Sequence, residues 1–139
     1  MQGHADERSV AEAYYAGLVA LDLDAVGATL APDVSAEAPG VTFESREPLL
    51  GWMRGFFDAF PGIEHVVDRL DVRDGRAVAD LRVIGTHTAP LASPQGSIPP
   101  TGRTMELHAH NEMQIEDGVI TSVRIAFDPG ELMSQLGLA

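Results

Sequence analysis

The stretch TMELHAHNEMQIE, residues 104–116, alternates apolar and polar residues almost without a break. A period of two is the side-chain period of a β-strand, in which successive residues point to opposite faces of the sheet. The pattern therefore predicts a strand with one inward face and one wet face. Asn111 is the single polar residue of the inward series, which comprises Met105, Leu107, Ala109, Asn111, Met113 and Ile115. A buried amide without a partner costs about 1–3 kcal/mol, so we expect a side chain, a water molecule or a ligand to satisfy it.

The segments on either side of this strand show the same alternation. A strand over 76–88 has His87 at the end of its inward series, which comprises Ala77, Ala79, Leu81, Val83, Gly85 and His87. The last strand, 119–127, has the inward series Val119, Thr121, Val123, Ile125 and Phe127. A further strand is predicted over 64–73, with a tight turn at Asp74-Gly75. A Pro- and Gly-rich segment follows over 89–102, and a short apolar tail over 129–139 is expected to dock on the body.

Three helices are predicted before this sheet. Residues 6–21 carry a helical apolar stripe that includes Tyr14, with Asp6 at the position of an N-cap. A shorter helix follows Asp22, and a strand candidate spans 34–39. The third helix starts near Pro48 and carries Leu49, Trp52, Met53, Phe56, Phe57 and Phe60. Helices ahead of a long curved antiparallel sheet, with isolated polar groups on its apolar face, predict an α+β fold around a pocket for an apolar small molecule.

Length and composition narrow the classes of partner. The chain has 139 residues, 45% of them hydrophobic, which suits one domain spanning residues 1–139. Its 9 basic and 21 acidic residues give a net charge of −12, which disfavours nucleic acid and anionic membranes as partners. No apolar run approaches the ~20 residues needed to span a bilayer. The N-terminal residues lack the pattern of an export signal, so we expect a cytoplasmic location.

The outward face of the 104–116 strand carries residues that could bind a metal ion. His108 and His110 share the outward face of the 104–116 strand with Glu106 and Glu112, a spacing that could hold a metal ion. Ordinary outward polar alternation explains these four residues fully. The sequence therefore predicts no metal ion and no cofactor.

Several short motifs resemble the SnoaL-like polyketide cyclases. They are Gly85-Thr86-His87-Thr88, Pro99-Pro100-Thr101-Gly102-Arg103, Glu116-Asp117-Gly118-Val119-Ile120, Phe127-Asp128 and Leu136-Gly137, together with Tyr14, Asp22-Leu23-Asp24 and Phe60-Pro61. This family belongs to the nuclear-transport-factor-two-like superfamily, which also holds ketosteroid isomerases and limonene epoxide hydrolases. The resemblance implies a cone-shaped α+β roll with three N-terminal helices on a curved antiparallel sheet, commonly paired as a homodimer.

The resemblance also implies roles for single residues. Tyr14 matches the helix-one tyrosine of ketosteroid isomerases, but the position of their base falls on Ala38 and that of their acid on Asn111. Epoxide hydrolases use carboxylates where this chain has Ile84 and Ile125, which disfavours that activity. His87 matches the Gly-Thr-His of SnoaL-like cyclases, whereas their aspartate again falls on Asn111.

The sequence thus leaves function hypotheses of different classes open. In the favoured one the protein is a cyclase or isomerase for a polyketide-like or polycyclic substrate. His87 would then act as the base, and Asn111 and Tyr14 would donate hydrogen bonds to an enolate oxygen. The expected substrate contacts are Trp52, Phe56, Phe60, Met113, Val123 and Ile125. The alternative is a non-catalytic binding or carrier protein on the same fold. We expect His87 and Asn111 to open into one cavity.

Overall fold

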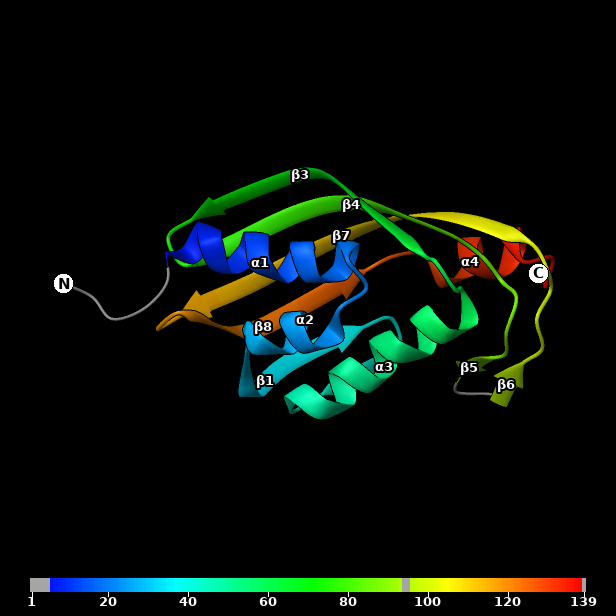
Figure 1. Cartoon of the computed structure of the whole chain (residues 1–139), viewed down its shortest axis with the longest axis horizontal. Helices are drawn as coiled ribbons and strands as arrows, with labels where there is room; N and C mark the ends of the chain where they lie inside the picture. Colours follow the sequence, from blue (N-terminus) through cyan, green and yellow to red (C-terminus); the bar gives the residue numbers. More distant parts are fainter. Residues whose placement is uncertain (1–5, 94–95, 139) are drawn as a thin grey trace.

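The computed structural model describes residues 6–93 and 96–138, and Figure 1 shows helices packed across one face of a curved sheet. The helices are α1 (Glu7–Val19), α2 (Leu23–Ala28), α3 (Arg46–Ala59) and α4 (Pro129–Gln135). The strands are β1 (Leu30–Ala38), β2 (Val41–Phe43), β3 (Glu64–Arg73), β4 (Arg76–Thr86), β5 (Leu91–Ser93), β6 (Gly96–Ile98), β7 (Thr104–Glu116) and β8 (Val119–Ala126). The predicted α+β class and the three N-terminal helices are confirmed.

The main sheet has the strand order β2-β1-β8-β7-β4-β3, and β5 pairs with β6 in a separate small hairpin. The sheet is mixed rather than wholly antiparallel, because β1 runs parallel to β8. A parallel pair needs a crossover connection, and here that connection contains α3 and strands β2 to β7. The expectation of an antiparallel sheet was wrong at this one pair, since strand alternation does not reveal which strands become neighbours.

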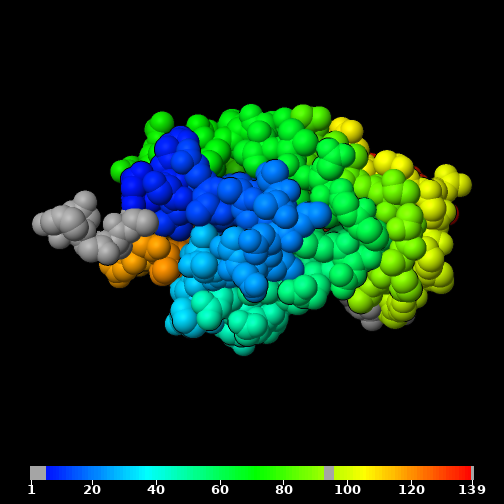
Figure 2. All heavy atoms as spheres, in the orientation of Figure 1, coloured from blue at the N-terminus to red at the C-terminus, as the bar shows by residue number. Residues whose placement is uncertain are grey.

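The inward face predicted for the 104–116 strand is confirmed. Its six inward residues are between 0% and 8% exposed, Asn111 included at 4%. The inward residues of β4 pair with them in antiparallel register, for example Ala79 with Asn111 and Leu81 with Ala109. Helices α1 and α3 cover this face, and Figure 2 shows the atoms of α1, α2 and α3 packed side by side over it.

The inward series predicted for the last strand is wrong for its first two residues, Val119 and Thr121. The β7–β8 register shifts between Gln114 and Ile115, so that Ile115 pairs with Ile120 and Gln114 pairs with Ser122. Ile120 is therefore fully buried, whereas Val119 and Thr121 are only half-buried. One extra residue in a strand reverses the faces of the residues that precede it, and Val123 returns to the inward side.

At the two ends of the described chain, one expectation needs a correction and the docking of the C-terminal tail is confirmed. Asp6 stands at the N-cap of α1, but its side chain makes no capping hydrogen bond. The C-terminal tail forms helix α4, and Leu132 of this helix and Leu136 directly after it are buried in a cluster with Met105. No helix in the described ranges has both the length and the apolar character required to cross a bilayer. Residues 1–5, on which the expectation about export rests, lie outside the described residues.

Helices α1 and α2 approach each other at Gly17, which gives a first prediction. A Cβ added at Gly17 would lie 2.8 Å from Val26 Cγ2 and 3.0 Å from the Val26 main-chain nitrogen. We expect Gly17→Ala to lower the free energy of unfolding by about 1–3 kcal/mol, because the helices must separate. Gly51 in α3 is exposed with no atom within 4 Å of such a Cβ. Gly51→Ala should instead raise stability by about 0.5–1 kcal/mol. Urea denaturation of both variants tests the contrast, and equal effects would contradict it.

Candidate small-molecule site in the cone

A cavity of about 90 Å³ lies between the inward face of the sheet and helices α1 and α3. Most of its lining is apolar, with Trp52, Phe56 and Phe57 contributed by α3 and aliphatic side chains contributed by β4 and β7. Among the predicted contacts, Trp52, Phe56 and Ile125 line this cavity. Trp52 and Phe56 are in edge contact with ring centroids 5.0 Å apart. Both are only half-buried, so this wall of the cavity borders solvent.

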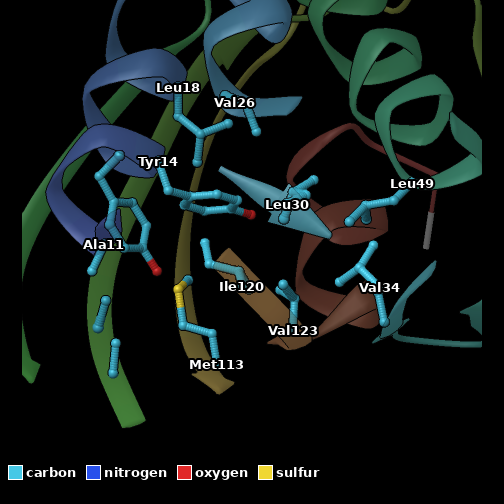
Figure 3. Close-up of a cluster of buried hydrophobic side chains, with 14 of the residues drawn as sticks. Ala11, Tyr14, Leu18, Val26, Leu30, Val34, Leu49, Met113, Ile120 and Val123 are labelled. Atoms are coloured by element: carbon cyan, nitrogen blue, oxygen red, sulfur yellow. The ribbon is translucent and has the colours of Figure 1, made fainter. Parts of the chain in front are cut away.

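The other predicted contacts lie elsewhere in the core. Met113 and Val123 are 2% and 1% exposed and pack in the cluster around Tyr14. Figure 3 shows Tyr14 reaching from α1 toward Leu30, with Met113 and Val123 on the strands beneath. Phe60 belongs to a second cluster at the end of α3. None of these three residues, Phe60, Met113 or Val123, is part of the cavity lining.

Unpaired polar atoms are concentrated at this cavity. Among the described residues, four buried side-chain polar atoms have no hydrogen-bond partner. Three of the four belong to lining residues: Tyr14 Oη, His65 Nδ1 and Asn111 Oδ1. Because folded proteins pair nearly all buried polar groups, each exception calls for an explanation. Three exceptions around one apolar cavity make it the candidate binding site, where a ligand or an ordered water molecule would supply the missing partners.

Asn111 is held in place by a neighbouring tyrosine. Its Nδ2 donates a hydrogen bond to Tyr15 Oη at 3.0 Å. A side chain was one of the three partners expected for this amide from the sequence. Its Oδ1 stays unpaired. Burial raises the pKa of Tyr14 and of Tyr15 above the ordinary value for a phenol. Tyr14 therefore keeps its proton at any physiological pH, and its hydroxyl is available as a hydrogen-bond donor.

His65 is a lining residue that the sequence analysis did not identify. It lies near the start of β3, and its ring is 5.7 Å from that of Phe57, centroid to centroid. Burial lowers its pKa, and a hydrogen bond with the main chain of Leu18 acts in the opposite direction. Strand β3 has a register shift between Val67 and Arg69, and half of its residues are exposed while the other half are partly buried. It therefore lacks the regular alternation that revealed Asn111.

His87 lies outside this cavity, although it is fully buried as predicted. Its ring stacks on Phe60 with centroids 5.2 Å apart, and its Nδ1 accepts a hydrogen bond from the main-chain N–H of Thr101 at 3.2 Å. Its main chain also pairs with Arg103 and Gly102. The expectation that His87 and Asn111 share one cavity is therefore wrong. The geometry gives His87 a structural place, because its ring and main chain hold the 101–103 segment against β4.

The polar residues on the opposite face of the sheet pair with one another. Arg82 donates two hydrogen bonds to the Asp68 carboxylate at 2.9 and 3.0 Å, and His110 Nδ1 lies 2.7 Å from Asp80 Oδ1. No group of three potential metal ligands gathers anywhere in residues 6–93 and 96–138. The outward position of His110 is thus explained by its pairing with Asp80 across the outer face of the sheet.

Comparison of the sequence with known protein families identifies the family of this chain. A family model for the SnoaL-like domain matches residues 11–123. The chain belongs to the SnoaL-like family. No functionally curated protein is similar enough to match this SnoaL-like domain.

Solved structures share the fold of this SnoaL-like domain at low sequence identity. TsrD from Streptomyces laurentii is 23% identical with a TM-score of 0.80, and the match covers 95% of each chain. IdmH from Streptomyces antibioticus, a proposed polyketide cyclase, is 23% identical with a TM-score of 0.77, covering 96% of this chain and 99% of IdmH. AclR from Streptomyces galilaeus, a proposed hydroxylase, is 20% identical with a TM-score of 0.80, covering 96% of each chain. The differing names show that this fold alone does not specify a reaction.

Proposed function

We propose that this SnoaL-like domain binds a neutral, apolar, polyketide-like or polycyclic carbonyl compound in the cone and catalyses its cyclisation or isomerisation. The observation that carries the proposal is the set of three unpaired polar groups around an otherwise apolar cavity. No Asp, Glu, Lys or Arg is among the described residues that line it. An anionic or cationic ligand would therefore lose its hydration there without gaining a counter-charge.

Tyr14 is suited to the electrophilic part of such a reaction. A neutral phenol in a dry site can donate a hydrogen bond to a carbonyl oxygen, and the bond strengthens as negative charge develops on that oxygen. Asn111 adds a second polar group, which Tyr15 holds in position. Because the Nδ2 of Asn111 donates to Tyr15, the atom left for the ligand is Oδ1, an acceptor that can bind a hydroxyl group but not an enolate oxygen. Tyr14 is therefore the donor that can stabilise the enolate, and a cavity that holds the reacting groups together favours ring closure.

A second candidate function is a carrier for the same class of ligand. It is favoured by one observation, namely that Asn111 stands where SnoaL-like cyclases are expected to have an aspartate. An amide cannot exchange a proton as a carboxyl group does. The homodimer implied by the family resemblance and the cytoplasmic location stay predictions.

The probe for this proposal is alpha-tetralone, a neutral bicyclic ketone. Trp52 is the single tryptophan of the chain and lines the cavity, so its fluorescence should report binding. We expect Ala109→Phe to weaken binding at least about tenfold, because the new ring occupies the cavity. Ala126→Phe adds the same ring at an exposed position of β8 and should leave binding unchanged. Circular dichroism checks that both variants fold.

Exchange of deuterium into the ketone separates a catalyst from a carrier. In D₂O, enolisation replaces the hydrogens on the carbon next to the carbonyl, and mass spectrometry measures the rate. Exchange faster than in buffer, together with binding, supports the cyclase or isomerase. Binding without faster exchange favours the carrier. If tetralone does not change the Trp52 fluorescence, the proposed site is wrong.

A further inference from the structure

We propose that His65 is the general base of this cavity, and that it takes the role that the sequence motif assigns to His87. This inference rests on the proposed function, which supplies the reaction but not the proton acceptor. It depends on where the His65 ring lies, on what else could accept a proton there, and on the partners of the ring.

The position of His65 places it beside the proposed oxygen-binding group. Helix α1 packs against β3, and Leu18 of this helix lines the cavity together with His65 of β3. Tyr14 precedes Leu18 by one helical turn, and residues four apart on a helix have Cβ atoms about 5–6 Å apart on the same face. Tyr14, Leu18 and His65 all line the cavity. The proposal places one small ketone in this cavity, with its oxygen toward the phenol of Tyr14 and its neighbouring carbon toward the imidazole of His65.

No other described lining residue can accept a proton at neutral pH. The lining contains no carboxylate and no lysine. Tyr14 stays protonated because burial raises its pKa, and Asn111 carries an amide. His87 is outside the cavity, and its Nδ1 already accepts a hydrogen bond from Thr101. The other ring nitrogen of His87, Nε2, is unpaired, as is Nδ1 of His65, but of these two histidines only His65 lines the cavity.

The protonation state of His65 suits this role. The ordinary histidine pKa is about 6.5, and burial lowers that of His65. The ring is consequently neutral at pH 7 and able to accept a proton. The titratable group that shares the cavity wall with it is Tyr14, and the neighbouring Glu64 is exposed. No charged side chain of the described lining opposes the neutral form.

The reaction step balances without any co-reactant. A proton on the carbon next to the substrate carbonyl moves to the imidazole of His65. The electron pair of that C–H bond forms the enolate, whose oxygen accepts a hydrogen bond from Tyr14. In a cyclisation the enolate carbon attacks a second carbonyl carbon, so that a C–C bond closes the ring. The resulting alkoxide then takes the proton back from His65.

The test compares His65→Gln with the wild-type protein in the tetralone exchange assay. A positioned general base contributes about 10²–10⁴-fold, so we expect exchange to fall about a hundredfold or more. Binding of tetralone, followed by Trp52 fluorescence, should change by less than about threefold, which shows that the cavity is still folded. The matched control is His110→Gln on the outer face of β7, which should leave the exchange rate within about twofold.

The pH profile of the wild-type protein gives an independent measurement that needs no variant. Exchange should rise with pH through a midpoint below 6.5 and then level off, because only the neutral ring accepts a proton. Protein-catalysed exchange that survives in His65→Gln would overturn the assignment of His65 and leave the proposed function standing. Binding without catalysed exchange in the wild type would overturn both the cyclase and its base. A hundredfold loss confined to His65→Gln supports the proposal.

Discussion

Asn111→Asp should lower the free energy of unfolding by about 4 kcal/mol at pH 8 and by far less at pH 4. The side chain at this position is 4% exposed, and its polar partner is Tyr15. Full burial raises a carboxyl pKa by up to 3–5 units, and each unit corresponds to about 1.4 kcal/mol. A shift of about 3 units gives the expected loss.

The direction of the pH dependence follows from the raised pKa. The folded state of the variant binds the proton more tightly than the unfolded state, whose aspartate pKa is about 3.9. Stability is therefore highest below about pH 4 and falls as the pH rises toward the pKa of the folded state, above which it is constant. Urea denaturation at several pH values measures this slope. Gln114→Glu, exposed on the same strand, should show no such slope, and parallel curves for the two variants would refute the assigned burial.

Phe60→Ala should cost about 3–5 kcal/mol, the range for truncating a buried aromatic residue. Phe60 is fully buried at the end of α3, where its ring stacks on His87 and lies 6.3 Å from the ring of Phe56. It also fills the space beside Gly85, where an added Cβ would be 3.0 Å from Phe60 Cβ. Its removal leaves a cavity between α3 and β4.

Chemical denaturation measures the effect of Phe60→Ala, and Val19→Ala provides the control. Val19 is 56% exposed at the end of α1, and surface substitutions usually change stability by less than about 0.5 kcal/mol. A loss below about 1.5 kcal/mol for Phe60→Ala would show that the α3 end is not packed as described. Phe60→Ala should change the free energy of tetralone binding less than it changes the free energy of unfolding, because Phe60 is not part of the cavity lining.

The features that the sequence predicted correctly are those that depend on local periodicity. The unbroken alternation of residues 104–116 was enough to place Asn111 inward on β7, and the aromatic spacing of α3 was enough to place Trp52 and Phe56 against the sheet. Asp22 likewise caps α2, accepting a hydrogen bond from the Ala25 N–H at 3.1 Å. In each case, neighbours along the chain determine the structure.

The features that were missed depend on contacts between distant segments. Bulges displace the phase of β3 and β8, so that His65 and Ile120 face inward without a regular pattern to reveal them. His87 follows its strand pattern and is buried, but Phe60 and the 101–103 segment occupy the space in front of it. A family motif identified the histidine, whereas only the packing of α3 against β4 decides which cavity it can reach.

The parallel pairing of β1 with β8 has a consequence for synthesis of the chain. β8 lies beside β1 in the sheet, but it is translated only after β1 and the six strands from β2 to β7. Until then, the β1 edge has open main-chain hydrogen-bonding groups, which are prone to pair with other chains. Contacts between distant segments also slow folding. The cone can therefore close only after β8 has been synthesised.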